Sequence, residues 1–266
     1  MIETAQKAAL AAGEILLQHF RRIPESAIRE KQKNDLISFV DEQAEQQIIS
    51  AIHRDYPQHT ILAEESGHKQ TDSAYQWIID PLDGTKNYLA GIPVFAVSIA
   101  VQKNHELQAG VIYDPLRNEL FRAEKGGGAY VNDQPIGVSA TGQLQNSFLA
   151  TGFPFKAKHL LSDYLKAFED IFRTAVGMRR MGAAAIDLAY VACGRFDGFW
   201  ELGLSPWDMA AGALIIREAG GHVSDFWNGE GFMDNSYVIA SNQLIHGELS
   251  DRLQQHFPQM KTVYQT

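Results

Sequence analysis

The chain is poor in cysteine, because Cys193 is the only one among its 266 residues. A single cysteine can form neither an internal disulfide nor a thiolate zinc site, which excludes a disulfide-stabilised scaffold. The helical context of small residues, AYVACG, predicts that Cys193 is a buried structural thiol.

Basic residues are outnumbered, with 23 lysines and arginines against 32 aspartates and glutamates, and the formal net charge is −9. An acidic chain is not expected to offer a broad phosphate-binding face, so we expect no direct nucleic-acid binding. For most of the acidic residues the simplest interpretation is solubility. An anionic small-molecule substrate would need local positive charge, which divalent cations held by carboxylates could supply.

Long hydrophobic runs are absent, and none approaches the ~20 residues that a bilayer-spanning helix needs. Residues 1–20 read as an amphipathic helix without a signal-peptide core, so we expect a cytoplasmic protein with no membrane association. The hydrophobic content of 45% is nevertheless enough for a sizeable core. No repeat or long linker separates the chain into independent parts. We predict one domain, residues 1–266, of two packed lobes: residues 1–137 with an antiparallel sheet, and residues 138–266 with mixed helices and strands.

The hydrophobic periodicity predicts helices and strands along the whole chain. Helices are predicted at residues 2–20, 41–54, 160–172, 183–192 and 206–219. Strands are predicted at residues 94–101, 107–114 and 119–124, which form an antiparallel meander, and at residues 147–152 and 196–202. The triple glycine at residues 126–128 opens no helix and lacks GxGxxG spacing, so a hairpin turn is favoured over a nucleotide loop.

Four acidic residues occur in three separate, otherwise apolar stretches: Glu64 in LAEES, Asp80 and Asp83 in WIIDPLDGTKNY, and Asp208 in PWDMAAG. The apolar residues 77–79 predict a strand that ends at Asp80, followed by a turn that presents Asp83 at a helix start. Carboxylates suit Mg²⁺, whereas the histidines show no zinc-ligand spacing. The competing interpretation is that DPLDG is only a capped turn, since its residues are favourable turn formers by themselves.

These motifs resemble those of the inositol monophosphatases. DPLDGTKNY is similar to the first signature of that family, and ELGLSPWDMAAG is similar to the second, in the expected order. The likeness extends to residues 33–36, LAEESG, YDPLRNELF, ATGFPFKAK and RRMGAAAIDLAYVACGRFDGFWE, and is closest to the bacterial SuhB-type branch. The resemblance implies the layered α-β-α-β-α sandwich of the inositol monophosphatase and fructose-1,6-bisphosphatase superfamily. It also implies a homodimer with magnesium at the junction of the lobes.

The resemblance further implies a set of metal ligands. Glu64, Asp80 and the carbonyl of Leu82 would hold one Mg²⁺, and Asp80, Asp83 and Asp208 would hold a second. Asp80 would then bridge the two ions, and Glu64 could also reach a third, weaker one. Two or three Mg²⁺ ions are therefore the implied cofactors.

The catalytic residues implied by the resemblance are Thr85 and Asp41. Thr85 would orient an attacking water, with Asp41 polarising its hydroxyl group. Gly84 would let the backbone approach a phosphate oxygen closely. Glu201 would bind the hydroxyl groups of a polyol, although a lone solvated acid is the plainer alternative. The implied substrate contacts are Asp83, Gly84, Thr85, Gly182, Ala183, Ala184, Glu201 and Asp208.

Two positions depart from the family pattern. Lys86 stands where small hydroxyl residues are common, and Ala183 replaces a frequent serine or threonine. We expect these changes to affect substrate preference and to leave the proposed metal ligands intact. Arg179 and Arg180 would lie near a subunit contact by resemblance, while an exposed basic pair is the simpler interpretation.

The function implied is Mg²⁺-dependent hydrolysis of inositol 1-phosphate or a similar small polyol monophosphate. The same metal cluster serves phosphatases of fructose 1,6-bisphosphate, adenosine 3′,5′-bisphosphate and histidinol phosphate, so these substrates stay open. A second hypothesis comes from the SuhB-type branch, which is associated with ribosomal-RNA transcription antitermination through Nus factors. The chain could then act mainly as a binding partner.

Overall fold

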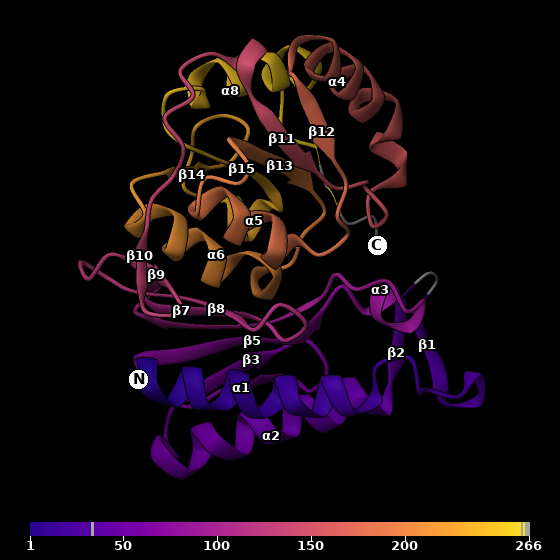
Figure 1. Cartoon of the computed structure of the whole chain (residues 1–266), viewed down its shortest axis with the longest axis vertical. Coiled ribbons are helices and arrows are strands. Elements are labelled where there is room, and N and C mark those ends of the chain that lie inside the picture. The colour runs from indigo at the N-terminus through magenta and orange to yellow at the C-terminus, as the bar shows by residue number, and fades with distance from the viewer. Residues whose placement is uncertain (33–34, 262, 264–266) are drawn as a thin grey trace.

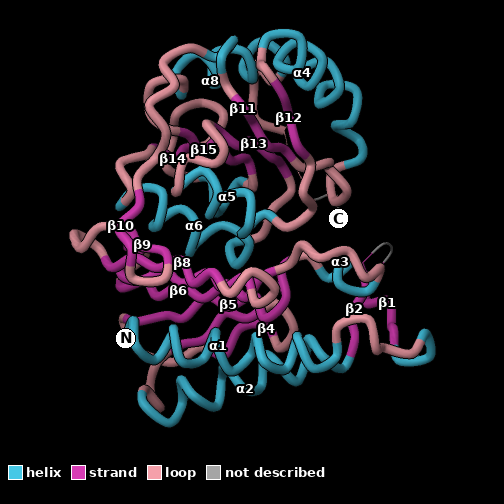
Figure 2. Tube along the Cα trace, viewed as in Figure 1, coloured by secondary structure: helices cyan, strands magenta, loops and turns pink. Residues whose placement is uncertain are grey.

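The computed structural model describes residues 1–32, 35–261 and 263, so Lys33 and Asn34 of the family-like run at residues 33–36 lie outside the described residues. Five layers alternate between helices and sheets (Figure 1). Two helices lie below an eight-stranded sheet, two more lie between it and a five-stranded sheet, and two others cover the outer face of the second sheet. The predicted α-β-α-β-α sandwich is confirmed, and Figure 2 shows the same alternation by element type.

The eight-stranded sheet has the order β10-β9-β8-β7-β6-β5-β3-β4. Its strands are β3 (Thr60–Ala63), β4 (Gly67–Lys69), β5 (Tyr75–Asp83), β6 (Ala96–Lys103), β7 (Glu106–Asp114), β8 (Glu119–Glu124), β9 (Ala129–Val131) and β10 (Gln134–Ile136). The predicted antiparallel meander is confirmed by the pairing of β6, β7 and β8. Residues 126–128 form the turn between the antiparallel strands β8 and β9, so the hairpin interpretation is also confirmed.

Helices α1 (Ile2–His19) and α2 (Phe39–Asp55) cover the outer face of this sheet. Both were predicted, and α1 buries Ala5, Ala9, Ala12 and Leu16 at helical spacing. α2 begins with a capping box in which the backbone and hydroxyl group of Ser38 both donate to the Asp41 carboxylate. The capping interaction therefore fixes the side chain of Asp41 at the start of α2.

β5 differs from the prediction, because it continues past Asp80 and ends at Asp83. Asp80 pairs with Ser98 and Asp83 pairs with Ala96, so three steps along β5 oppose two along β6. This extra residue is a β-bulge, which keeps the strand paired while it changes the direction of the side chains. The sequence reads as a turn because Pro81 and Gly84 are turn residues, yet the pairing with β6 is retained up to Asp83.

The five-stranded sheet has the order β12-β11-β13-β15-β14 and is mixed. Its strands are β11 (Phe148–Thr151), β12 (Gly177–Arg179), β13 (Gly198–Leu202), β14 (His222–Ser224) and β15 (Tyr237–Ser241). Helices α4 (Leu161–Thr174) and α8 (His246–His256) pack together on its outer face. The predictions for β11, β13 and α4 are confirmed within two residues at each end. The division into lobes at Gly137 stays a prediction.

Helices α5 (Ala184–Ala192) and α6 (Pro206–Glu218) form the middle layer and contact each other as well as both sheets. Every residue of α5 is buried, as expected for a central helix that is apolar except at Asp187. Cys193 follows α5 and is only half-buried, so the prediction of a buried thiol was wrong. The apolar context belongs to the helix, and Cys193 lies just past its end, where the chain turns toward solvent.

The remaining elements are short: β1 (Ile28–Gln32), β2 (Asp35–Ser38), α3 (Thr85–Leu89), α7 (Phe232–Asn235) and 3₁₀ turns at Glu25–Ala27, Leu144–Asn146 and Lys158–Leu160. α3 follows β5 directly and begins at Thr85, with Gly84 as its N-cap residue. Among the described residues, none of the helices combines the length and apolarity required to cross a bilayer.

Candidate active site

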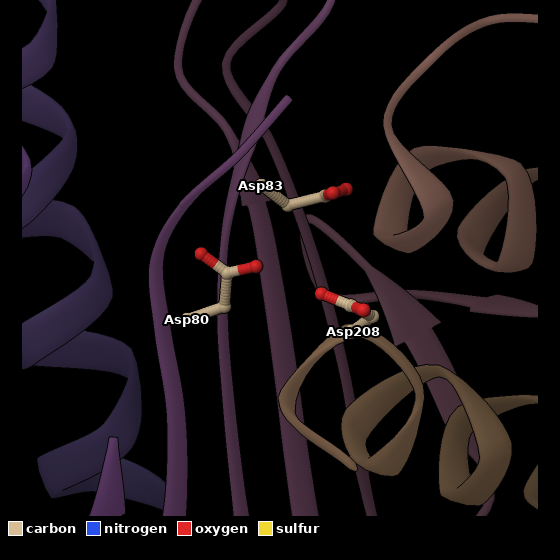
Figure 3. A group of neighbouring side chains, drawn as sticks. All are labelled: Asp80, Asp83 and Asp208. Carbon is tan, nitrogen blue, oxygen red and sulfur yellow. The ribbon is translucent and has the colours of Figure 1, made fainter. Parts of the chain in front are cut away.

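Asp80, Asp83 and Asp208 converge between the first sheet and the middle helix layer (Figure 3). Asp80 and Asp83 lie on either side of the β5 bulge, and Asp208 lies in the first turn of α6. One carboxylate oxygen from each of the three lies within 4.8 Å of the other two. Residues separated by more than a hundred positions are therefore brought to one point.

Backbone amides hold each of the three carboxylates in place. Asp80 accepts the N–H of Leu82 at 2.9 Å, and Asp83 accepts that of Ala185 at 2.7 Å. Asp208 accepts the N–H of Ser205 at 2.7 Å. A carboxylate has two oxygens, so an amide bond to one is compatible with cation ligation through the other. The three side chains are thus oriented before any ligand binds.

The cluster is electrostatically unfavourable without a counterion. Burial raises the pKa of Asp80 well above its ordinary value, and the charges of its three acidic neighbours add to the rise. Burial and then the charge of Asp208 raise the pKa of Asp83 to about 7, although amide hydrogen bonds oppose the rise. Buried like charges destabilise one another unless protons or cations neutralise them. The cluster therefore favours binding of positive charge.

Glu64 lies just after β3 and is half-buried. Its carboxyl group contacts Asp80, raising the pKa of Asp80 through both its charge and a side-chain hydrogen bond. Glu64 is not one of the three residues whose ligand atoms lie within 4.8 Å of one another. The structure thus brings three predicted metal ligands together and leaves Glu64 beside them, next to Asp80.

Thr85 connects the cluster to α2. Its hydroxyl group lies 3.3 Å from Oδ1 of Asp41 and 3.0 Å from the carbonyl oxygen of Leu82. The hydroxyl group has one proton and can donate to only one of these acceptors at a time. The predicted pair of Thr85 and Asp41 is therefore in contact, and the carbonyl of Leu82 is the second acceptor.

Gly84 and Gly182 both have positive φ angles, of 89° and 87°. A Cβ atom at Gly84 would lie 3.0 Å from the carbonyl oxygen of Val94 and 3.1 Å from Ala183, so the backbone approach there requires glycine. Asn87 ties the two loops together by donating to the carbonyl oxygens of Val94 and Met181, each at 2.9 Å. The loop before α5 is thereby fixed against the turn after β5.

Glu201 lies in β13, next to the last residue of the strand, and is half-buried. Burial and then the charge of Asp208 raise its pKa to about 8, whereas the charge of Arg180 acts in the opposite direction. Its carboxylate lies so close to Gly152 that a Cβ atom at that position would overlap it. Glu201 is therefore part of the site's electrostatic environment, which contradicts the alternative of a solvated loop acid.

The donor set fits a hard divalent cation. Every group that the three aspartates present is a carboxylate oxygen, and Mg²⁺ prefers oxygen ligands, often one or two carboxylates with waters. Burial and neighbouring acids raise the pKa values of Asp80 and Asp83, so a bound cation would relieve the repulsion within the cluster. Geometry and charge thus agree on cation binding.

The sequence profile of the inositol monophosphatase family matches residues 1–261. The chain belongs to the inositol monophosphatase family. Among curated relatives, the Nus factor SuhB of Salmonella typhimurium is 45% identical over 262 residues, covering 95% of this chain and 98% of that protein.

Solved structures of this family show the same fold. The crystal structure of the extragenic suppressor protein suhB from Bartonella henselae has a TM-score of 0.92 and 41% identity, covering 95% of this chain and 98% of that one. The inositol monophosphatase from Anabaena (Nostoc) sp. PCC 7120 has a TM-score of 0.86 and 41% identity, covering 96% of this chain and 95% of that one.

Two features of this inositol monophosphatase family member's site were missed from the sequence. Asp187 is 1% exposed, and no atom in the described part of the chain hydrogen-bonds its Oδ1. Burial raises its pKa well above the ordinary value, with the charges of Glu201 and Asp83 adding to the rise. The amide of Ala185 was also overlooked, because the predicted amides were those of residues 182–184. The sequence did offer a signal for Asp187, since it is the one acidic residue in an otherwise apolar predicted helix, a position where a carboxyl group is costly unless it has a function.

Proposed function

We propose that this chain is a Mg²⁺-dependent phosphomonoesterase that hydrolyses inositol 1-phosphate or a similar small polyol monophosphate. The observation that carries the proposal is the convergence of three carboxylates within 4.8 Å, two of them buried and that of Asp208 half-buried, beside the contact between Thr85 and Asp41. Family membership supports phosphatase chemistry, and the Anabaena relative is named an inositol monophosphatase. The substrate and the choice of metal are the parts that experiment must establish.

The residues that would hold Mg²⁺ are those predicted from the sequence. The carboxylate oxygens of Asp80, Asp83 and Asp208 would be the central ligands. The carbonyl oxygen of Leu82 accepts a hydrogen bond from the Thr85 hydroxyl group. The Glu64 carboxyl group contacts Asp80. When bound, such cations lower the pKa of water and neutralise charge on phosphate oxygens.

Thr85 and Asp41 would orient the attacking water. When the Thr85 hydroxyl donates to Asp41, its oxygen lone pairs can accept a hydrogen bond from the water, which orients that water for attack. Water would attack phosphorus in line with the phosphorus–oxygen bond to the polyol. That bond breaks, the polyol oxygen takes up a proton from solvent and leaves as the alcohol, and no covalent intermediate with a side chain is involved. The amides of Gly84 and Thr85 would contact a phosphate oxygen, because Gly84 leaves no side chain in the way.

Glu201 would bind the polyol. A carboxyl group whose pKa is about 8 can be protonated near neutral pH, so it can donate as well as accept hydrogen bonds with substrate hydroxyl groups. Gly182, Ala183 and Ala184 would line the same side of the substrate. The methyl group of Ala183 packs toward Gly84, so the hydroxyl group common at this position in the family is replaced by an apolar contact.

The test is phosphate release by the purified chain from a substrate panel with Mg²⁺. The panel comprises inositol 1-phosphate, fructose 1,6-bisphosphate, adenosine 3′,5′-bisphosphate and histidinol phosphate. Activity that disappears in EDTA and in Asp83→Asn, and is highest in kcat/KM for inositol 1-phosphate, supports the proposal. Asp72→Asn, an exposed acid, is the matched control. Release that persists unchanged in EDTA would refute it.

A second candidate function rests on the names of the relatives. Several curated relatives at 42–45% identity are named Nus factor SuhB, which supports a role in ribosomal-RNA transcription antitermination. We infer that such a role would use a surface outside the metal cluster. Co-purification with Nus factors from cells, carried out with wild type and Asp83→Asn, tests this. Equal recovery supports a scaffold role, and no recovery of either contradicts it.

We also propose that the chain forms a homodimer. Apolar side chains on and just after α4 are exposed in the single chain, namely Leu161, Leu165, Phe172 and Val176. Exposed apolar surface of this kind is typical of protein contacts. Sedimentation equilibrium of wild type and Phe172→Glu tests whether this face is used, and a monomeric wild type at micromolar concentration would contradict the proposal.

A further inference from the structure

Glu45 is a buried acid of α2 that is not one of the three clustered aspartates. Its side chain is 3% exposed. Its two carboxylate oxygens accept the backbone N–H groups of Glu65 and Ser66, each at 2.8 Å. An ionised carboxylate can accept at both oxygens, and hydrogen bonds to an ionised acceptor are stronger than those between neutral groups. Glu45 therefore holds two consecutive amides of a distant segment.

The two amides belong to the turn that carries Glu64. Residues 64–66 connect the antiparallel strands β3 and β4. The N–H of Glu64 donates to the carbonyl oxygen of Ile79 in β5 at 3.2 Å. Three consecutive amides of the turn are thus held, the first by the sheet and the next two by Glu45. From this turn the carboxyl group of Glu64 contacts Asp80.

The turn is only partly packed. Glu64 and Glu65 are half-buried, and Ser66 is exposed. A cavity of about 460 Å³ adjoins the turn, and Glu45, Glu65 and Ser66 are among the residues that line it. A segment with space beside it and few buried contacts can shift when its hydrogen bonds are removed. The bonds to Glu45 therefore restrain the turn where packing does not.

Glu45 lies one helical turn after Asp41 in α2. Residues four positions apart lie on the same face of a helix, and both of these carboxyl groups are buried. Asp41 contacts the Thr85 hydroxyl group, whereas Glu45 holds the turn of Glu64. One face of α2 thus contacts both the residue proposed to orient water and the turn that carries a proposed metal ligand.

We propose that Glu45 is a positioning residue for Glu64, and that it strengthens Mg²⁺ binding by holding the Glu64 carboxyl group beside Asp80. This inference rests on the proposed phosphatase function, in which Glu64 is a metal ligand, and deepens it. Glu45 touches neither metal nor substrate and acts through the two amides of the turn. Removing a group that orients a metal ligand in this way typically weakens metal binding about 10- to 100-fold.

The test is a calorimetric titration of the purified chain with Mg²⁺, without substrate. We expect Glu45→Gln to weaken Mg²⁺ binding about 10-fold, because glutamine has one acceptor oxygen and its NH₂ group would face the second amide. Glu45→Asp keeps the negative charge but is one methylene shorter, so it should weaken binding to a similar extent. It also carries the comparison if Glu45→Gln is too unstable to purify. Wild-type affinity in Glu45→Asp would mean that only the charge matters, which would overturn the proposal.

Asp225→Asn is the matched control for a loss of stability. Asp225 is also a buried carboxylate that holds a turn: Oδ1 accepts the N–H groups of Trp227 and Gly229 at 2.9 and 2.7 Å, and Oδ2 accepts Nδ2 of Asn235 at 2.9 Å. In Asp225→Asn an NH₂ group would likewise face a donor. We expect this variant and Glu45→Gln both to lower Tm, while Asp225→Asn leaves the Mg²⁺ affinity unchanged.

Equal Mg²⁺ affinities in wild type and both Glu45 variants would assign Glu45 a structural role only and refute the proposal. A double-mutant cycle adds a sharper criterion. If Glu45 acts through Glu64, Glu45→Gln should cause no further loss of Mg²⁺ affinity when Glu64→Gln is already present. A further loss as large as in the wild-type background would show that Glu45 acts independently of Glu64, which also contradicts the proposal.

Because these measurements need no turnover, the positioning role and the phosphatase function can fail separately. Mg²⁺ affinities that follow the expected pattern, in a chain that hydrolyses none of the substrate panel, would refute the phosphatase proposal and leave the role of Glu45 standing. Normal hydrolysis combined with an unchanged Mg²⁺ affinity in Glu45→Gln and Glu45→Asp would do the reverse.

Discussion

The hydroxyl group of Thr85 lies 3.3 Å from Oδ1 of Asp41, although 44 residues separate them in the chain. Asp41 uses its other oxygen, Oδ2, to accept the backbone N–H and the hydroxyl group of Ser38. The Asp41 carboxylate therefore caps the start of α2 and also contacts the Thr85 hydroxyl group, which we propose to be catalytic. Activity and local helix stability are linked through this side chain.

Removing either partner of this contact should slow hydrolysis. We expect Thr85→Ala and Asp41→Asn each to lower kcat by at least about 100-fold, because the water loses its oriented acceptor. Thr85→Ser keeps the hydroxyl group and should retain most of the activity. Asp41→Asn should also lower the free energy of unfolding by about 1 kcal/mol through the weakened cap, whereas Thr85→Ala should not. Steady-state kinetics and urea unfolding measure both effects, and near-normal kcat in both variants would exclude the proposed role.

The acidic cluster should make the cation-free protein less stable as the pH rises. The folded-state pKa values of Asp83 and Glu201, about 7 and about 8, exceed the ordinary values of 3.8 and 4.5. The folded state therefore binds more protons than the unfolded state, and this contribution to stability is lost as the pH rises from about 4 to about 8. Mg²⁺ offsets the repulsion, so the increase in Tm on adding Mg²⁺ should grow over the same range.

Thermal unfolding in EDTA and in saturating Mg²⁺ measures this dependence. Asp83→Asn should reduce both the slope of Tm with pH and the gain from Mg²⁺, and Asp72→Asn should change neither. An increase in Tm with Mg²⁺ that is independent of pH would show that the cluster is neutralised in another way.

The contact between Gly152 and Glu201 predicts an effect on selectivity. In Gly152→Ala the new methyl group must displace the Glu201 carboxylate. Since a misplacement of about 1 Å can reduce a rate by roughly 100-fold, we expect kcat/KM for inositol 1-phosphate to fall by about 10- to 100-fold. Hydrolysis of p-nitrophenyl phosphate, which has no polyol, should fall much less. Gly142→Ala is the control, because nothing lies within 4 Å of its added Cβ atom. Equal losses on both substrates would mean that Glu201 does not bind the polyol.

His246 should make the fold sensitive to acid, independently of the metal. Its two ring nitrogens each lie 2.8 Å from a hydroxyl group, those of Ser224 and Ser241. Burial lowers the pKa of His246 from 6.5 to about 4, with the charge of His222 acting in the same direction. The folded state therefore favours the neutral ring, and stability falls as the pH drops from about 6.5 toward 4, by about 3 kcal/mol in all.

Urea unfolding of wild type and His246→Gln at several pH values checks this. The difference in unfolding free energy between the two proteins should shrink as the pH falls through that range. Exposed His68, substituted in the same way, should leave the pH dependence unchanged. A constant difference between wild type and His246→Gln would show that the ring is not the titrating group.

Local patterns were sufficient for most of the fold. α1, α2 and the meander of β6, β7 and β8 were predicted from apolar spacing, because each buries one regular face against a neighbour. The end of β5 was predicted wrongly, since Pro81 and Gly84 favour a turn while the pairing with β6 extends the strand through a bulge. Backbone pairing with a distant strand is not encoded in the local composition.

In the site, too, some features follow from local sequence and others from contacts between distant segments. The acids could be found because carboxylates in apolar stretches are costly unless they bind something. Their convergence, and the contact between Thr85 and Asp41, followed from family resemblance rather than from spacing. The amide of Ala185 on Asp83 and the bonds from the turn at residues 64–66 to Glu45 depend on how distant segments fold together, which no local pattern specifies.

The amide of Ala185 meets Asp83 across 102 positions of the chain. Neither sheet, taken with its own helices, contains all of the acidic residues of the site. A fragment with only one of the two sheets would therefore have no activity even if it folded. Two such fragments, mixed, could regain the site only by reassociating along the middle helix layer. Recovery of turnover would then report directly on how well that layer had been rebuilt.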